Sequence, residues 1–266
     1  MYAIRHVFLL MLVTSLTACA TGLSKPSPAV LGELAPTGKL RVGVVVGNIA
    51  TPALATKNTA TGAAQGVAID LAGELAQQLG VALEVVPYPT PAKLFESVNS
   101  DAWDVTFLVL DPVRAKDVDF SPPYTNIGNT YLVAPGSKIG SIADIDRPGI
   151  RVAVPEHGPQ DLYLTKSLKH AELVRAPGPE PTFQLLVAGK VDAFAHGRPL
   201  LLGVANKLPG SRVLDGSFSS FGHAMAVPKG RPLASAYIRA FIEQAMASGS
   251  VRRAIDRAGL LGVDVP

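Results

Sequence analysis

An arginine that follows a predicted buried strand is the residue best placed to bind an anion in this chain. The apolar run 105–110 is typical of a strand covered on both faces, and Asp111 and Pro112 follow it directly. Asp111 suits an N-cap and Pro112 the first helical position, so Arg114 is expected at the carboxyl end of a parallel strand. Ligands of open α/β sheets bind at that edge, and a guanidinium matches a carboxylate or a phosphate. The alternative is an ordinary surface arginine in a first helical turn.

A long loop after the first predicted strand offers further polar groups. The segment 47–66 is rich in Thr, Ala, Asn and Gly, which indicates a loop. Its length is unusual for a compact domain, so the loop is either functional or partly mobile. Asn48 and Thr51 lie beyond the carboxyl end of the strand and are candidates for facing a ligand.

Alternating strands and helices must position these side chains. Strands are predicted at 40–46, 83–87, 104–110, 129–134, 151–154, 173–175, 191–195, 212–214 and 222–228. Helices are predicted at 67–79, 90–98, 141–145, 159–170, 181–188, 198–208, 232–248 and 250–258. This alternation predicts an α/β fold with right-handed parallel crossovers in doubly wound sheets. Two βα series joined by β segments, with helices after the second, predict two lobes.

Composition limits the class of protein. The chain has 266 residues, of which 48% are hydrophobic and 17% charged, as expected of a well-buried globular protein. Its formal charge of +3 is modest and its basic residues are scattered, so no electrostatic footprint for nucleic acid is present. The lone cysteine excludes an intramolecular disulfide and a cysteine-based zinc site.

The N-terminus predicts export. Arg5 and His6 precede the apolar run 7–13, which is too short to span a bilayer, so residues 1–18 are predicted to be a signal peptide. The run Leu16-Thr17-Ala18-Cys19 resembles a bacterial lipoprotein box, in which the cysteine is acylated and becomes the mature N-terminus. The alternative is a plain signal peptide with a chance cysteine. Residues 19–36, with Gly, Ser and prolines, predict a flexible tether.

Six motifs in order resemble the family 3 extracellular solute-binding proteins of ABC transporters, a group that includes polar amino-acid binders. Together they cover residues 38–262. They are Leu40-Arg41-Val42-Gly43-Val44, Gly66-Val67-Ala68-Ile69-Asp70-Leu71 with Leu79-Gly80, Trp103-Asp104-Val105, Arg114 with Val118-Asp119-Phe120-Ser121-Pro122-Pro123-Tyr124, Gly189-Lys190-Val191-Asp192-Ala193, and Ala224-Met225-Ala226-Val227-Pro228-Lys229-Gly230.

The resemblance implies a two-lobe periplasmic-binding-protein-like fold (type II) that closes on two hinge strands around a ligand. Lobe 1 would comprise 37–130 plus 222–266, and lobe 2 would comprise 131–221. The protein is expected to be a monomer in the periplasm, held at the membrane by a lipid on Cys19. Its expected partners are a small anionic or amino-acid-like solute and the membrane subunits of the transporter, and no cofactor is expected.

The resemblance also assigns roles to residues. Arg114 occupies the place of the arginine that grips the ligand's carboxylate in this family. The second lobe of such proteins adds backbone N–H groups from a turn that opens a helix, and here this turn contains His157 and Gly158. Pro159 follows and has no N–H, so this side of the anion site is thinner than usual. Asp111 is expected to be an N-cap, with contact to a ligand hydroxyl or amine as the alternative.

One departure from the family pattern concerns the ligand's ammonium. Amino-acid binders carry an acidic residue shortly after the Asp-Ala of the second lobe, but no carboxylate occurs between Ala193 and Arg198. A buried ammonium without a partner is costly, so the expected solute is a carboxylate held without the usual ammonium pair. Arg198 either favours a second acidic group or is a solvent-facing residue near a helix start.

The sequence gives little support for a metal site or a catalytic site. One alternative places His157 and His196 in the same cleft, but their spacing is no metal signature. Glu156 beside His157 could act as acid and base. No phosphate loop, nucleophile elbow or Ser/His/Asp arrangement occurs. The main prediction is therefore a binding protein. The alternative is an enzyme on the same scaffold, a lyase like cyclohexadienyl dehydratase, whose substrate also lacks an ammonium.

Overall fold

The computed structural model describes residues 25–46, 55–58, 60–156 and 158–266. Four of the predicted functional residues, Cys19, Asn48, Thr51 and His157, lie outside these ranges. In the described part of the chain, no helix is long and apolar enough to cross a membrane.

Helices and strands alternate over most of the described chain. In order, they are α1 (Pro28–Leu34), β1 (Lys39–Val45), β2 (Thr56–Lys57), β3 (Ala64–Gln65), α2 (Val67–Leu79), β4 (Ala82–Tyr88), α3 (Pro91–Glu96), β5 (Val105–Val109), the 3-10 turn η1 (Arg114–Lys116), β6 (Val118–Val133), the 3-10 turn η2 (Ile142–Asp144), β7 (Arg151–Pro155), α4 (Pro159–Ser167), β8 (Glu172–Ala176), α5 (Pro179–Val187), β9 (Ala193–Gly197), α6 (Arg198–Ala205), β10 (Arg212–Val213), β11 (Ser219–Pro228), α7 (Pro232–Ala247) and α8 (Ser250–Arg257).

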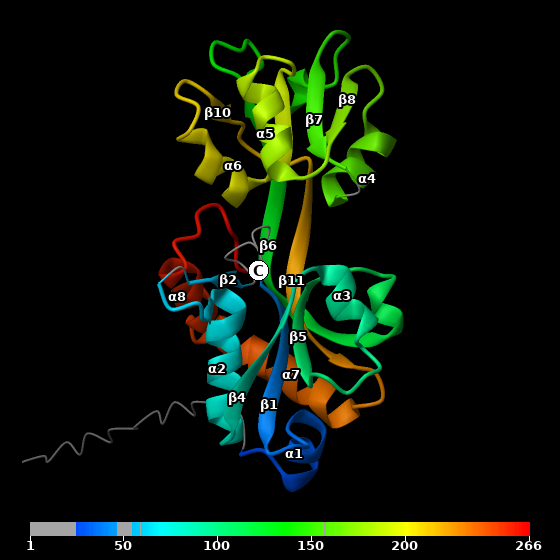
Figure 1. The fold of residues 1–266 in the computed structure, drawn as a ribbon, viewed down its shortest axis with the longest axis vertical. Coiled ribbons are helices and arrows are strands. Elements are labelled where there is room, and N and C mark those ends of the chain that lie inside the picture. The colour runs from blue at the N-terminus through cyan, green and yellow to red at the C-terminus, as the bar shows by residue number, and fades with distance from the viewer. Residues whose placement is uncertain (1–24, 47–54, 59, 157) are drawn as a thin grey trace, which may run out of the picture.

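A two-lobe fold results, as predicted, and two long strands join the lobes (Figure 1). Lobe 1 holds the parallel strands β4, β1 and β5, with α1, α2, α3, α7 and α8. Lobe 2 holds the parallel strands β9, β7 and β8, with α4, α5 and α6. The antiparallel pair β6 and β11 passes through both, so the strand order β4-β1-β5-β11-β6-β9-β7-β8 runs continuously from one lobe to the other. We call β6 and β11 the hinge strands.

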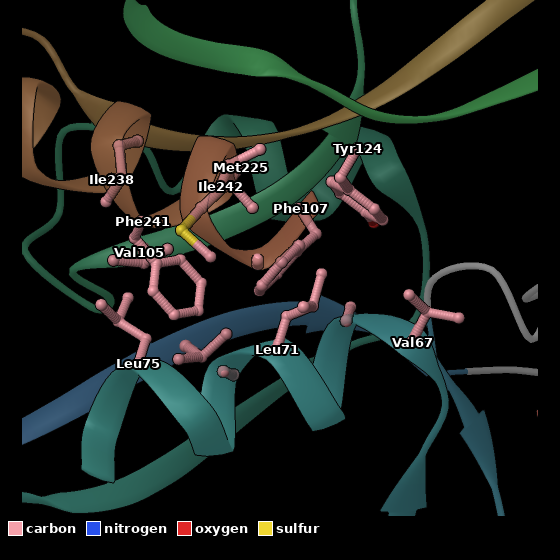
Figure 2. Close-up of a cluster of buried hydrophobic side chains, with 14 of the residues drawn as sticks. Val67, Leu71, Leu75, Val105, Phe107, Tyr124, Met225, Ile238, Phe241 and Ile242 are labelled. Atoms are coloured by element: carbon pink, nitrogen blue, oxygen red, sulfur yellow. The ribbon is translucent and has the colours of Figure 1, made fainter. Parts of the chain in front are cut away.

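The core of lobe 1 forms between α2, the sheet and α7. Helix α2 presents Val67, Leu71 and Leu75 toward the sheet, as the helical spacing of these residues predicts (Figure 2). Phe107 of β5 and Met225 of β11 lie in the same buried cluster. Gly80 ends α2 in the left-handed conformation at φ 71°, which a residue without a Cβ adopts at little cost. Hydrophobic burial therefore fixes α2 beneath the strands whose ends carry the candidate site.

Lobe 2 has its own core on both faces of its sheet. Tyr131, Val152 and Val154 belong to a cluster on one face, and Ala153 and Phe194 to a cluster on the other. Successive residues of β7 thus point to opposite faces, as the two-residue period of a strand requires. Lobe 2 is consequently a packed unit with hydrophobic clusters separate from that of lobe 1.

Helix α1 lies within the segment that was predicted to be a flexible tether. The Ser27 side chain accepts a hydrogen bond from the N–H of Val30, and Pro28 occupies the first turn. The carboxylate of Glu33 accepts from the N–H of Ala234 at 2.8 Å, and its carbonyl accepts from Arg231 at 3.2 Å. Contacts with α7 therefore order residues 28–34, and the tether prediction does not hold there.

Two further differences concern strands. The predicted loop 47–66 contains the antiparallel hairpin of β2 and β3. The hinge strand β6 is longer than predicted and continues through Pro122 and Pro123, where its pairing with β11 shifts register. Because prolines have no N–H to donate, irregular pairing is expected there. The hydroxyl of Ser121 accepts a bond from the N–H of Met225 at 3.1 Å, which satisfies a donor near the irregularity.

Candidate functional site

The carboxyl ends of parallel strands from both lobes meet the hinge strands at neighbouring positions. In lobe 1, β5 ends where Val109 pairs with His223 of β11. In lobe 2, β9 ends where Gly197 pairs with Asn129 of β6. Since His223 and Asn129 lie only a few residues apart along the β6–β11 pair, the two strand ends flank one short stretch of the hinge. This is the edge at which α/β sheets bind ligands.

Arg114 lies in η1, directly after β5, where the sequence predicts it. A carboxylate oxygen of Asp111 accepts hydrogen bonds from the N–H of Val113 at 2.7 Å and of Arg114 at 3.3 Å, so Asp111 caps this turn. Arg114 is half-buried, and within the described part of the chain its guanidinium has no hydrogen-bond or ion-pair partner. A half-buried guanidinium without an intramolecular partner can bind the carboxylate of a ligand.

Gly158 opens α4 at the carboxyl end of β7 in lobe 2. Its backbone is extended, with φ −80° and ψ 166°, and its N–H donates to the carbonyl of Pro155 over a long 3.4 Å. A Cβ at this position would lie 3.3 Å from the Pro155 oxygen and 3.3 Å from the Gln160 side chain. Pro159 occupies the first turn and offers no N–H. The start of α4 therefore offers few N–H donors to an anion.

Gln160 is a site-adjacent residue that the sequence reasoning missed. Its buried amide donates to the Asn129 side chain at 2.7 Å, and the Asn129 amide donates to the Ser219 hydroxyl at 2.9 Å. This chain of bonds ties the start of α4 to both hinge strands. A polar residue in the first turn of a helix is ordinary in sequence, so only the fold identifies its partner.

Arg198 is engaged within lobe 2. Its Nη2 atom donates to the carbonyl oxygens of Leu214 at 2.9 Å and Gly216 at 2.6 Å. Its methylene groups lie against Gly262, where a Cβ would come within 2.6 Å of the arginine Cδ. These contacts do not favour the prediction that Arg198 reaches a second acidic group of a ligand.

Two histidines near the hinge are neutral at physiological pH. His223 is buried, with its Nδ1 atom 3.1 Å from the Thr125 hydroxyl, and burial lowers its pKa to about 4. Loss of solvation likewise lowers the pKa of His196 to about 4, and its Nδ1 atom accepts from the N–H of Gly197 at 2.8 Å. Neither ring supplies a positive charge for a ligand. In the described part of the chain, no group of three or more His, Cys, Asp or Glu could hold a metal ion.

An apolar contact fills the space beside Gly197, just after the Asp-Ala motif. A Cβ there would lie 3.2 Å from Cγ2 of Ile127 and 3.8 Å from the ring of Phe221. Ile127 and Phe221 pair with each other across the hinge strands. The amide oxygen of Asn129 lies 3.9 Å from the same Cβ position. Among the described residues, the hinge wall next to the end of β9 is therefore mainly hydrocarbon, with one neutral amide and no carboxylate among the atoms nearest to that position.

Comparison with known proteins places this geometry in a family. Residues 44–259 match the bacterial extracellular solute-binding proteins, family 3. The glutamine-binding protein of Geobacillus stearothermophilus is 30% identical over 194 residues, which cover 71% of this chain and 72% of that protein. The cyclohexadienyl dehydratase of Pseudomonas aeruginosa is 30% identical over 138 residues, covering 50% of this chain and 51% of the enzyme.

A solved structure has the same architecture. It is an ancestral cationic amino-acid solute-binding protein, 28% identical, with a TM-score of 0.70 over 85% of this chain and 98% of that one. The strand-end arginine, the two-lobe fold and the family match over most of the chain agree with one another. The chain belongs to the bacterial extracellular solute-binding proteins, family 3.

Proposed function

We propose that this protein is the solute-binding component of an ABC importer and that it captures a small, carboxylate-bearing solute between its lobes. The observation that carries the proposal is Arg114, a half-buried guanidinium without a partner in the described chain, at the end of β5. Closure about β6 and β11 would bring Arg114 toward the start of α4 at Gly158. Water excluded from the closed cleft would strengthen the arginine–carboxylate bond.

The hinge wall supports a solute without an ammonium in the usual place. Gly197 has no side chain, and Ile127 and Phe221 occupy the space next to it. The amide oxygen of Asn129 lies 3.9 Å from the Gly197 Cβ position and already accepts from Gln160. A cation here would lose its hydration and find no charged partner among these atoms. The favoured solute is therefore an organic acid, or an amino acid whose ammonium is held elsewhere. Asn48 and His157, which lie outside the described residues, and the capping residue Asp111 remain predicted contacts.

Cellular role follows from the family and from the N-terminus. The proposed partners are the membrane subunits of the transporter, and the proposed location is the periplasm, with a lipid on Cys19 as the membrane anchor. The protein would act as a monomer, with lobes bounded as predicted at 37–130 plus 222–266 and at 131–221.

A second candidate function is a lyase like cyclohexadienyl dehydratase. The similarity to the enzyme of Pseudomonas aeruginosa favours it, and so does the missing carboxylate near Gly197, since an enzyme of this type also needs no ammonium site. Glu156 and His157 would be its acid and base. Incubation with a cyclic dicarboxylate distinguishes the two functions, because only the lyase releases a dehydrated product.

A thermal-shift screen tests the proposed function. Organic acids and α-amino acids are compared for the rise in melting temperature that a ligand of the folded state produces. For any hit, Arg114→Ala should remove the rise in melting temperature, because the carboxylate loses its charged donor. Lys116→Ala removes an exposed cation from the same turn and should leave the rise intact. An undiminished rise in Arg114→Ala would show that another residue anchors the solute.

A further inference from the structure

The segment that follows α8 runs alongside the hinge. We call residues 260–266 the strap. In Figure 1 the strap rises from lobe 1 toward α6 and ends beside β6. Asn126 of β6 and Asp264 exchange both backbone hydrogen bonds, at 2.8 Å and 3.1 Å, as an antiparallel bridge. The strap therefore adds a third strand-like connection at the point where the two hinge strands cross between the lobes.

The strap is anchored in lobe 1. Val263 is buried in the same hydrophobic cluster as α2 and α7, and its carbonyl is 3.5 Å from a guanidinium nitrogen of Arg252 on α8. The N–H of Leu260 donates to the carbonyl of Ile255 at 3.2 Å, which fixes the exit from α8. Burial of a valine and these backbone contacts hold the strap to lobe 1 when lobe 2 moves.

The same strap contacts lobe 2 through Gly262. This glycine has φ +69°, and a Cβ on it would lie 2.6 Å from Cδ and 2.7 Å from Cγ of Arg198, and 3.2 Å from Leu202. Both contacts come from α6. Bonds from Arg198 to the carbonyls of Leu214 and Gly216 hold its side chain in this position. The bare backbone of Gly262 thus lets α6 rest on the strap.

We propose that the strap sets the angle between the lobes through the contact between Gly262 and Arg198. In a hinge a few residues absorb the φ/ψ changes of domain closure, so a single pair of strands leaves many lobe angles open. A contact away from that pair restricts the rotations that keep it intact. Arg198 then serves lobe positioning rather than solute binding. The functional meaning rests on the hinge closure proposed above, but the contact itself exists without any solute.

Distances between spin labels in the protein without solute test the strap. Cysteines replace the exposed residues Gln77 on α2 and Lys166 on α4, in a full chain that carries Cys19→Ser. Gly262→Ala should shift and broaden the distance distribution between lobes, because the new Cβ displaces α6. Gly259→Ala is the matched control: Gly259 has φ +63°, a similar strain on substitution, but nothing lies within 4 Å of its Cβ position. An unchanged distribution in Gly262→Ala, or an equal change in both variants, would overturn the proposal.

A second pair of variants acts from the side of lobe 2 and serves if Gly262→Ala does not fold. Arg198→Ala removes the contact with the strap and two bonds to carbonyls of lobe 2. Arg212→Ala removes comparable bonds, to the carbonyls of Ser137 and Ile139, without touching the strap. Only Arg198→Ala should broaden the distribution, and equal behaviour of the two variants would refute the strap. Because no solute is used, a failure to find a solute leaves this test unaffected.

Discussion

The two lobes fasten their sheets with the same pair of residues in different surroundings. In lobe 1, Arg41 donates to Asp104 from its backbone N at 3.0 Å, from Nε at 3.0 Å and from Nη2 at 2.6 Å. In lobe 2, Arg151 donates to Asp192 from the same atoms at 2.8, 3.1 and 3.0 Å. The backbone N–H of each aspartate donates to the carbonyl of the arginine. Asp104 directly precedes β5, which pairs with β1, and Asp192 directly precedes β9, which pairs with β7.

We call these two Arg–Asp pairs the clasps of lobe 1 and lobe 2, and they differ in how deeply they are buried. The side chain of Asp104 is 0% exposed and that of Arg41 16%, whereas Asp192 and Arg151 are 33% and 38% exposed. Arg231 of the α7 N-terminus also reaches Asp104, at 3.4 Å, and links it to α1 through the carbonyl of Glu33. One geometry is therefore a buried network in lobe 1 and a solvated surface pair in lobe 2. The comparison teaches that burial, rather than bond geometry, decides how much such a pair matters.

Replacing Asp104 should produce the largest loss of stability of the variants compared here. Asp104→Asn leaves the guanidiniums of Arg41 and Arg231 without their buried counter-charge, and breaking a buried pair costs about 3–5 kcal/mol. Urea denaturation followed by circular dichroism measures the loss in free energy of unfolding. Asp192→Asn is the matched change in lobe 2. Equal losses in the two variants would show that burial does not distinguish the clasps.

The residue two positions after the paired arginine differs between the lobes and gives the next largest effect. Lobe 1 has Gly43 where lobe 2 has the buried Ala153, and a Cβ on Gly43 would lie 2.8 Å from Leu94 and 2.9 Å from Trp103. Gly43→Ala should destabilise the protein by about 1–3 kcal/mol through overpacking. Thermal or urea unfolding measures it. Gly73→Ala, in α2 with open space around it, should instead be neutral or stabilising.

Asp192→Asn should have the smallest effect of the three. Exposed ion pairs contribute about 1 kcal/mol or less, and water replaces what the partner loses. The backbone N–H of Arg151 can still donate to the amide oxygen of an asparagine. A loss of stability that falls markedly as salt is added would agree with a solvated pair. A loss as large as that of Asp104→Asn, and insensitive to salt, would contradict it.

Local patterns were enough to predict much of the fold. The apolar spacing of α2 and the left-handed Gly80 fix that helix within its own residues, and its predicted bounds are those observed. Helix α1 was missed because its order comes from α7, through Glu33 and Ala234, which lie far apart in sequence. Only the part of β6 from residue 129 onward was predicted as strand, because Pro122 and Pro123 interrupt the pattern of the earlier part and its pairing with β11 lies far away in sequence.

The residues of the candidate site also differ in how far local sequence predicts them. Arg114 was predictable because Asp111 caps the turn that carries it immediately after a strand. Arg198 follows β9 as expected, but its partners, the carbonyls of Leu214 and Gly216, are set by tertiary packing. Gln160 and its buried bond to Asn129 likewise have no local signal. Spacing in sequence identifies which strand end a side chain occupies, whereas its bonding partners depend on the chain that folds against it.

Acid titration tests whether charge pairing stabilises the clasp of lobe 2. The bond from Arg151 holds the pKa of Asp192 below the 3.8 of an unperturbed aspartate, so the folded state favours the charged carboxylate. The stability gained is fully present above that unperturbed pKa and is lost as pH falls through the lower pKa of the folded state. The difference in unfolding free energy between wild type and Asp192→Asn should therefore be constant from neutral pH to about pH 5 and shrink below pH 3.8. Urea titrations at a series of pH values measure it, and a difference that persists undiminished at the lowest pH would mean that packing, not charge, holds the clasp of lobe 2.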